Sequence, residues 1–191
     1  SASLTNERLS EFGTQELSNL AWAFSTLKIH DVPLVRAISE RLVQLILECK
    51  AQELANTAWA FARINVFDRP LLHAIASRAA DTLEAEPRHL SIILWSFATL
   101  LFENRPLITG VAAAFQRLIA ANSCEAQTLS NTSWSLATLQ VLHFPLLNVI
   151  SAAASVRIST FGPQELSNTA WAFAALPIPD LPLMSAVADA S

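Results

Sequence analysis

Five tryptophans divide this chain of 191 residues into nearly equal segments. Their successive separations are 37, 36, 39 and 37 residues, with the indoles at Trp22, Trp59, Trp95, Trp134 and Trp171. Eleven residues after every tryptophan stands a proline that is followed by leucine, at Pro33, Pro70, Pro106, Pro145 and Pro182. A spacing repeated at this interval is typical of repeat proteins, in which each unit packs on the next. The sequence therefore predicts a linear array of about five units of 36–39 residues.

A ten-residue sequence motif recurs in four units, each time with the tryptophan inside it. It reads QELSNLAWAF at 15–24, QELANTAWAF at 52–61, QTLSNTSWSL at 127–136 and QELSNTAWAF at 164–173. In the last unit Leu166, Ala170 and Phe173 recur at steps of three and four residues, which is the α-helical period. We therefore expect an α-helix, called helix A, to run through the tryptophan of each unit.

A second helix, helix B, is predicted to begin at the proline of each unit. Two residues before the proline stands a short side chain with an acceptor oxygen in four units, namely Asp31, Asp68, Asn104 and Asp180. The fourth unit has His143 at this position. An acceptor here caps the free amides of a helix, and the proline presets the backbone of the first turn.

These patterns predict an all-α protein, an α-solenoid of two-helix repeats. Residues 1–13 match the end of a helix B, so the chain is expected to be truncated within a hairpin at both ends. The predicted segments are 1–13, the repeats 14–50, 51–86, 87–125 and 126–162, and a partial repeat at 163–191. Since neither end reads as a polar capping repeat, we expect further repeats or protein partners at both ends.

Helix A is apolar or small around almost its whole circumference, so it must be covered on several sides. We predict that the tryptophans fill the space between units and, together with the five prolines, form the structural core of the repeats. The alternative is that the indoles stack on nucleic-acid bases, which aromatic faces do without demanding a particular sequence.

The composition favours no catalytic or metal chemistry. Hydrophobic residues make up 52% of the chain and charged residues 15%, with a net charge of −4. Cys49 and Cys124 lack metal-binding spacing and are expected to be buried free thiols. The four histidines form no ligand or catalytic pattern. We therefore expect no enzyme activity, cofactor, metal or small-molecule substrate, and the absence of a long charge-free apolar run predicts no membrane insertion.

Two-helix units with this phrase in helix A and a Pro-Leu pair at the start of helix B resemble the octotricopeptide repeats of algal organellar proteins. They are also similar to the heptatricopeptide and FAST-kinase-like leucine-rich, RAP-associated repeats. The resemblance covers residues 14–191. It implies binding of single-stranded organellar RNA, a role in RNA processing, stability or translation, and location in the mitochondrion or the chloroplast.

An asparagine stands three residues before four of the tryptophans, at Asn19, Asn56, Asn131 and Asn168, and the third unit has Ile92 instead. Asparagine is a mediocre helix former, so its recurrence needs a compensating interaction. One interpretation is that these amides bind base edges, one nucleotide per repeat. The other is a structural ladder, in which each amide bonds the backbone of the adjacent unit.

Arginines on helix B are the candidate phosphate ligands, namely Arg41, Arg78, Arg117 and Arg157. Few such contacts are available, because the chain has more acidic than basic residues. The leading hypothesis is an RNA-binding protein of organellar RNA processing, which predicts a basic concave surface carrying the asparagines. The alternative is a non-catalytic scaffold buried in a large assembly, which predicts exposed apolar patches.

Overall fold

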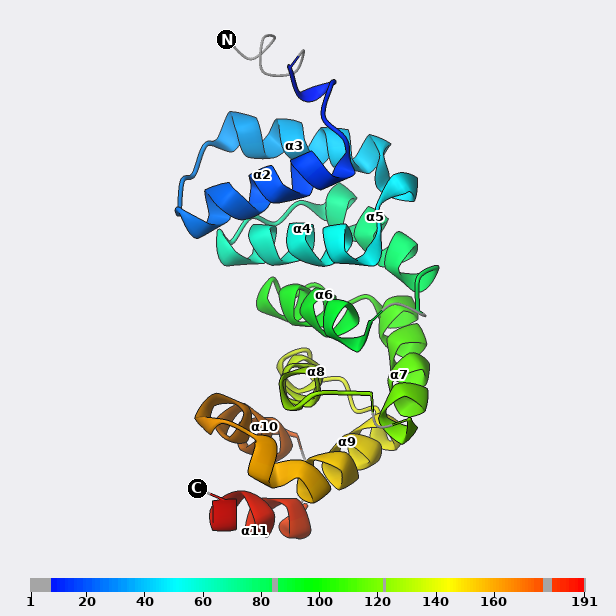
Figure 1. Ribbon diagram of the computed structural model, residues 1–191, viewed down its shortest axis with the longest axis vertical. Helices are drawn as coiled ribbons and strands as arrows, with labels where there is room; N and C mark the ends of the chain where they lie inside the picture. Colours follow the sequence, from blue (N-terminus) through cyan, green and yellow to red (C-terminus); the bar gives the residue numbers. More distant parts are fainter. Residues whose placement is uncertain (1–7, 84–85, 122, 177–179, 191) are drawn as a thin grey trace.

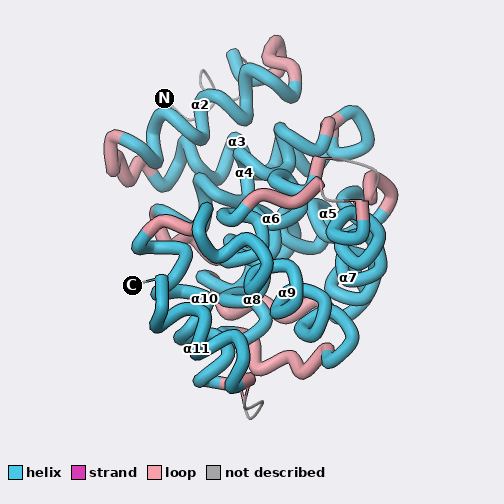
Figure 2. Tube along the Cα trace, turned by 60° about the horizontal axis from the view of Figure 1, so that its bottom comes forward, coloured by secondary structure: helices cyan, strands magenta, loops and turns pink. Residues whose placement is uncertain are grey.

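The computed structural model describes residues 8–83, 86–121, 123–176 and 180–190. Within these ranges it contains no strand, which confirms the all-α solenoid (Figures 1 and 2). The first helices of the repeats are α2 (Thr14–Thr26), α4 (Ala51–Arg63), α6 (Pro87–Thr99), α8 (Ala126–Thr138) and α10 (Pro163–Ala175). The second helices are α3 (Val32–Gln44), α5 (Arg69–Ala80), α7 (Arg105–Ala120), α9 (Phe144–Arg157) and α11 (Leu181–Ala190). Short 3₁₀ turns follow α3 and α9, at Ile46–Glu48 and Ile158–Thr160.

The helices form two layers. The A helices pack against one another in the order α2, α4, α6, α8 and α10, and the B helices α3, α5, α7, α9 and α11 pack in the same order beside them. Figure 1 shows the array as an arc in which α6 and α8 lie on the inside and α7 and α9 on the outside. Residues 1–7 of the predicted first segment lie outside the part of the chain that the structure describes.

Each B helix begins where the sequence predicts. The backbone N–H of the leucine after the proline donates to the predicted capping side chain at 3.0–3.2 Å in all five units. His143, the exception in the sequence, makes the same cap, because its Nδ1 accepts from the Leu146 N–H at 3.2 Å. A neutral imidazole nitrogen is an acceptor, so it replaces the carboxylate in this role.

Two columns of large apolar side chains on the A helices pack into the core, which buried side chains of the B helices complete. Five residues before each tryptophan is a buried leucine, at Leu17, Leu54, Leu90, Leu129 and Leu166. Two residues after it, four of the five units have a buried Phe or Leu, at Phe61, Phe97, Leu136 and Phe173. Small residues such as Ala55, Ala58, Ser133 and Ala172 are also buried, which allows neighbouring A helices to approach closely.

The tryptophans are not buried inside this core, although Trp59 and Trp95 are partly buried and pack against it. Trp22 and Trp171 are each 48% exposed, and the other three indoles are half-buried. The helix geometry explains the difference. A residue two positions after the tryptophan lies about 200° around the helix, because each residue turns it by about 100°. Once Phe61 faces the core, Trp59 must face the opposite side of the A layer.

The prolines are also not part of the core, since all five are exposed. Each stands in the first turn of its B helix, where its missing N–H leaves no hydrogen bond unmade. The leucine after the proline is the residue that packs into the core. Four of these five leucines are fully buried, at Leu71, Leu107, Leu146 and Leu183. The prolines therefore set where each helix begins, and the leucines anchor it.

The turn from helix A to helix B uses a left-handed residue in the first four units. The residue six positions after the tryptophan has φ between 52° and 57°, at Lys28, Asn65, Leu101 and Gln140. The next N–H reaches back five residues to a helix carbonyl, as in the bond from Val66 N–H to Phe61 O at 2.9 Å. This Schellman arrangement satisfies carbonyls that the helix end would leave unpaired.

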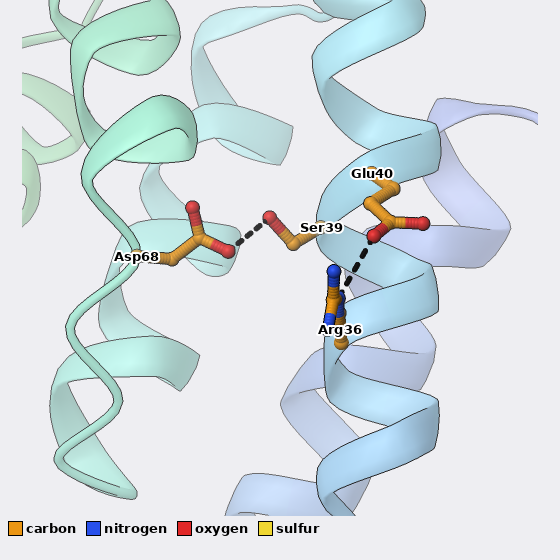
Figure 3. A network of polar contacts seen from close by, with 4 residues as sticks. All are labelled: Arg36, Ser39, Glu40 and Asp68. Atoms are coloured by element: carbon orange, nitrogen blue, oxygen red, sulfur yellow. Dashed lines mark hydrogen bonds and ion pairs between the residues drawn. The ribbon is translucent and has the colours of Figure 1, made fainter.

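Neighbouring units are also joined by a polar contact between B helices. Ser39 on α3 donates its hydroxyl to Asp68 Oδ2, at the start of α5, at 2.5 Å (Figure 3). The other carboxylate oxygen of Asp68 caps the Leu71 N–H at 3.1 Å. On the same helix Arg36 pairs with Glu40 at 2.9 Å, and both of these side chains are exposed.

Candidate functional site

The face of helix A opposite the core carries three columns of side chains. The tryptophans form the first, and the asparagines with Ile92 form the second. A third column stands four residues before the second and comprises Gln15, Gln52, Arg88, Gln127 and Gln164. Residues at i, i+4 and i+7 lie on one side of a helix. All three columns therefore lie on the same face of the A layer.

A groove of about 390 Å³ runs across this face. It takes lining residues from all five A helices, namely Trp22, Asn56, Trp59, Arg88, Ile92, Trp95, Gln127, Asn131, Gln164 and Asn168. The lining combines aromatic rings with amides, and Arg88 is the one charged residue among the ten. Such a surface offers stacking and hydrogen bonds but little charge.

The tryptophans contact one another from unit to unit, and we call this arrangement the tryptophan row. Trp22 and Trp59 stack with centroids 6.4 Å apart and planes inclined by 24°. The Trp95–Trp134 and Trp134–Trp171 pairs lie at 6.3 and 6.2 Å with inclinations of 31° and 35°. Among the described residues no ring contact joins Trp59 to Trp95, so the row is interrupted between the second and third units. The predicted contact of successive units through their indoles is thus present in three of four pairs.

The asparagine amides are available for a ligand. In the described part of the chain none of the four side chains hydrogen bonds with another protein group, and all four are exposed or half-exposed. The structure therefore gives no support to the structural ladder. Asn56, Asn131 and Asn168 line the groove, whereas Asn19 is not among its lining residues. The three amides in the groove each offer two N–H donors and an acceptor oxygen.

The predicted arginines do not join this site. Arg41 and Arg78 donate to backbone carbonyls of the preceding connection, Arg41 to Ser10 O at 3.1 Å and Arg78 to Cys49 O at 3.3 Å. Arg157 makes the equivalent bond to Cys124 O, and Arg117 is exposed on α7. None of the four lines the groove. Three of these arginines therefore hold the start of an A helix in place, because their guanidinium groups bond the chain before it.

The glutamine column and two arginines on the A helices were not among the site residues predicted from the sequence. Arg88 replaces glutamine in the third unit and lines the groove. Arg63 stands four residues after Trp59, and its Cζ lies 5.1 Å from the centroid of that ring, in a cation–π contact. The sequence did contain a sign of these residues. Aligning the units on their tryptophans shows the recurring glutamine and the two positions where an arginine departs from the repeat.

The described residues hold no group of three or more His, Cys, Asp or Glu side chains placed to bind a metal. Burial raises the pKa of both the Cys49 and Cys124 thiols to about 11, with Glu53 adding to the effect at Cys49. Both thiols therefore stay protonated and unreactive near neutral pH. Over the same part of the chain no helix is long and apolar enough to span a membrane.

Comparison with known proteins agrees with an RNA-associated helical protein. Residues 2–191 match the family described as RNA-editing substrate-binding complex 6 protein. None of the curated proteins matches the chain. The matched family is not the octotricopeptide or RAP-associated family that the repeat motif resembles. Its description refers to RNA editing, a form of RNA processing, and names no organelle. Because the match covers nearly the whole chain, this protein belongs to the RNA-editing substrate-binding complex 6 protein family.

Proposed function

We propose that this protein is a non-catalytic RNA-processing factor that binds single-stranded RNA in the groove of its A layer. The observation that carries the proposal is the convergence of indoles and unpaired amides from five repeats in one groove. Single-stranded RNA is recognised through unstacked bases, which stack on aromatic rings and hydrogen bond through their edges. The groove supplies both kinds of contact and extends over several nucleotides.

Stacking and hydrogen bonding, rather than charge, are expected to supply most of the affinity. The chain has a net charge of −4, and Arg88 is the one charged residue lining the groove. Affinity for single strands falls with a slope of about −0.7 per phosphate contact in a plot of log K against log salt. With Arg63 nearby, we expect about two contacts and hence a shallow slope of about −1.4.

The family description supports a role in RNA editing within a multiprotein complex. We propose the mitochondrion as the site of this role, since RNA-editing complexes of the kind named in the family description are typically mitochondrial. The resemblance of helix A to octotricopeptide repeats also implies organellar RNA processing. The chloroplast has no support beyond that resemblance. The substrate proposed for this chain is an organellar transcript.

A second candidate function is to hold other proteins of such a complex. Apolar residues are exposed along the edge where helix A turns into helix B, at Leu27, Ile29, Val32, Phe67, Leu101, Leu142, Phe144 and Leu181. Every described unit contributes to this edge, and exposed apolar surface of this kind often marks a protein interface. The edge and the groove involve different residues, so the two functions are compatible.

Fluorescence anisotropy with labelled RNA tests the RNA-binding function. We expect the chain to bind a single-stranded oligonucleotide and not a duplex of the same sequence, because the bases of a duplex are already stacked and paired. Replacing Asn131 and Asn168 by alanine should weaken binding about fivefold per amide, the value of one hydrogen bond. Replacing the exposed Asn148 of α9 by alanine is the matched control and should leave the affinity unchanged.

The stability of the double variant separates the two interpretations of the asparagines. If the amides serve the ligand, the free energy of unfolding should not fall, and it should rise by up to about 1 kcal/mol because alanine is the better helix former. A chain that binds neither single-stranded RNA nor the duplex at low salt would refute the proposed function. Retention of protein partners by that same chain would then favour the second candidate.

A further inference from the structure

The interruption of the tryptophan row coincides with three departures from the repeat pattern. The third unit replaces the glutamine and asparagine of the other units by Arg88 and Ile92. The second unit has Arg63 four residues after its tryptophan, where the others have Thr26, Thr99, Thr138 or Ala175. We refer to the place between Trp59 and Trp95 as the break. No other junction of the array combines an interrupted row with two nearby arginines among the described residues.

The contacted tryptophan pairs have no room for a base. A base inserted between two parallel rings needs them about 6.8 Å apart, twice the ~3.4 Å rise of stacked bases. The three contacted pairs have centroids 6.2–6.4 Å apart and inclined planes. The ring of Trp59 also contacts the Arg63 guanidinium, a group that a base can displace from an aromatic face.

Arg63 and Arg88 lie on opposite sides of the tryptophan row. Arg63 follows Trp59 by one helical turn, whereas Arg88 precedes Trp95 by two turns, or about 10 Å along the helix. Both side chains are exposed, and neither has an ion pair in the described part of the structure. In a groove lined otherwise by amides, rings and an isoleucine, the positive charge is therefore concentrated at the break.

From these features we infer that the break is the anchor point of the bound RNA strand, an inference that rests on the proposed function. One base stacks between Trp59 and Trp95, taking the place of the Arg63 guanidinium. Arg63 and Arg88 then bind the phosphates on the two sides of that nucleotide. The neutral amides of the other units contact the flanking bases. The break thus sets the register of the strand on the array.

Variants that restore the pattern of the other units test the inference. Arg63→Thr and Arg88→Gln each introduce the residue that most other units carry, so neither disturbs the fold. Each should make the negative slope of log K against log salt shallower by about 0.7, and the double variant should make it shallower by about 1.4. Arg117→Gln, at an exposed arginine of the B layer, is the matched control and should leave the slope unchanged. Titrations use labelled single-stranded 12-nucleotide RNA and the whole chain, with circular dichroism to check folding.

The stacking step has its own readout. Trp59→Ala and Trp95→Ala should each weaken binding more than Trp134→Ala, by about tenfold or more, since a base contacts the rings at the break. Equal losses at all three positions, or unchanged salt slopes in both arginine variants, would overturn the anchor point while leaving RNA binding intact. Failure of the unaltered chain to bind the oligonucleotide would instead remove the proposed function itself.

Discussion

The hydroxyl of Ser39 donates a hydrogen bond to Asp68, the residue that caps the first turn of α5 (Figure 3). This bond spans 29 residues of sequence and links the B helices of the first two units. One carboxylate thus caps its own helix with one oxygen and holds the preceding unit with the other. The contact connects local helix capping with the stacking of repeats.

Replacing Ser39 by alanine should therefore weaken the junction between these units. A hydrogen bond to a charged group contributes about 1.5–3 kcal/mol, so we expect a loss of that order in the free energy of unfolding. Urea denaturation measures it. Ser77→Ala is the matched control, because Ser77 is exposed on α5 and should tolerate alanine without loss. Equal effects of the two substitutions would mean that the bond contributes nothing.

Leu101 offers a site for stabilisation. It has φ of 52°, a left-handed backbone conformation that is strained for leucine. Its side chain is 73% exposed and therefore adds little stability through burial. Leu101→Gly should raise the free energy of unfolding by about 1 kcal/mol, because glycine has no Cβ to clash in this conformation. Leu27, 68% exposed, has φ of −77°. Leu27→Gly should lower stability by about 1 kcal/mol, and thermal melts distinguish the signs.

The orientation of the tryptophans predicts an inverted order of mutational costs. Phe61→Ala should destabilise by about 3–5 kcal/mol, since it empties a buried site. Trp22→Ala should cost much less, about 1–2 kcal/mol, because nearly half of that larger side chain is already exposed. Chemical denaturation of both variants checks the order. If Trp22→Ala lost more free energy of unfolding than Phe61→Ala, the indole would have to be counted as a core residue.

The two buried thiols predict a loss of stability at high pH. Their pKa is about 11 in the folded chain against 9.0 for an ordinary thiol. Above pH 9 the unfolded chain releases these protons and the folded chain retains them, so the unfolded state gains stability as pH rises. The expected loss at pH 10 is roughly 1 kcal/mol per thiol. Below about pH 8 this loss of stability is absent, because the thiols are protonated in both the folded and the unfolded chain.

Comparison with a Cys49→Ala, Cys124→Ala variant isolates this effect from the titration of lysines. The difference in unfolding free energy between the two proteins should shrink between pH 8 and pH 10. Alkylation by iodoacetamide provides a second measure, since it requires the thiolate. Rapid alkylation of either cysteine in the folded chain at pH 8 would contradict the burial of these groups.

The order of elements in this protein was available from the sequence. Asp31 and its equivalents with the Pro-Leu pair identified the start of each B helix, and the recurring phrase located each A helix. These are local signals, because capping and helical periodicity act within a few residues. Even His143, which the pattern left as an exception, performs the capping that its position required.

The roles of the side chains on helix A depended on the tertiary structure. An A helix is apolar around most of its surface, so the sequence alone did not distinguish the side that faces the B layer from the side that faces the groove. Packing assigned Phe61 and Leu54 to the core and placed Trp59 at the groove, where it is partly buried. It likewise directed Arg41 and Arg78 to backbone carbonyls while placing Arg88 in the groove. Local rules set where helices begin and end, whereas contacts between distant units decide which face of each helix a ligand meets.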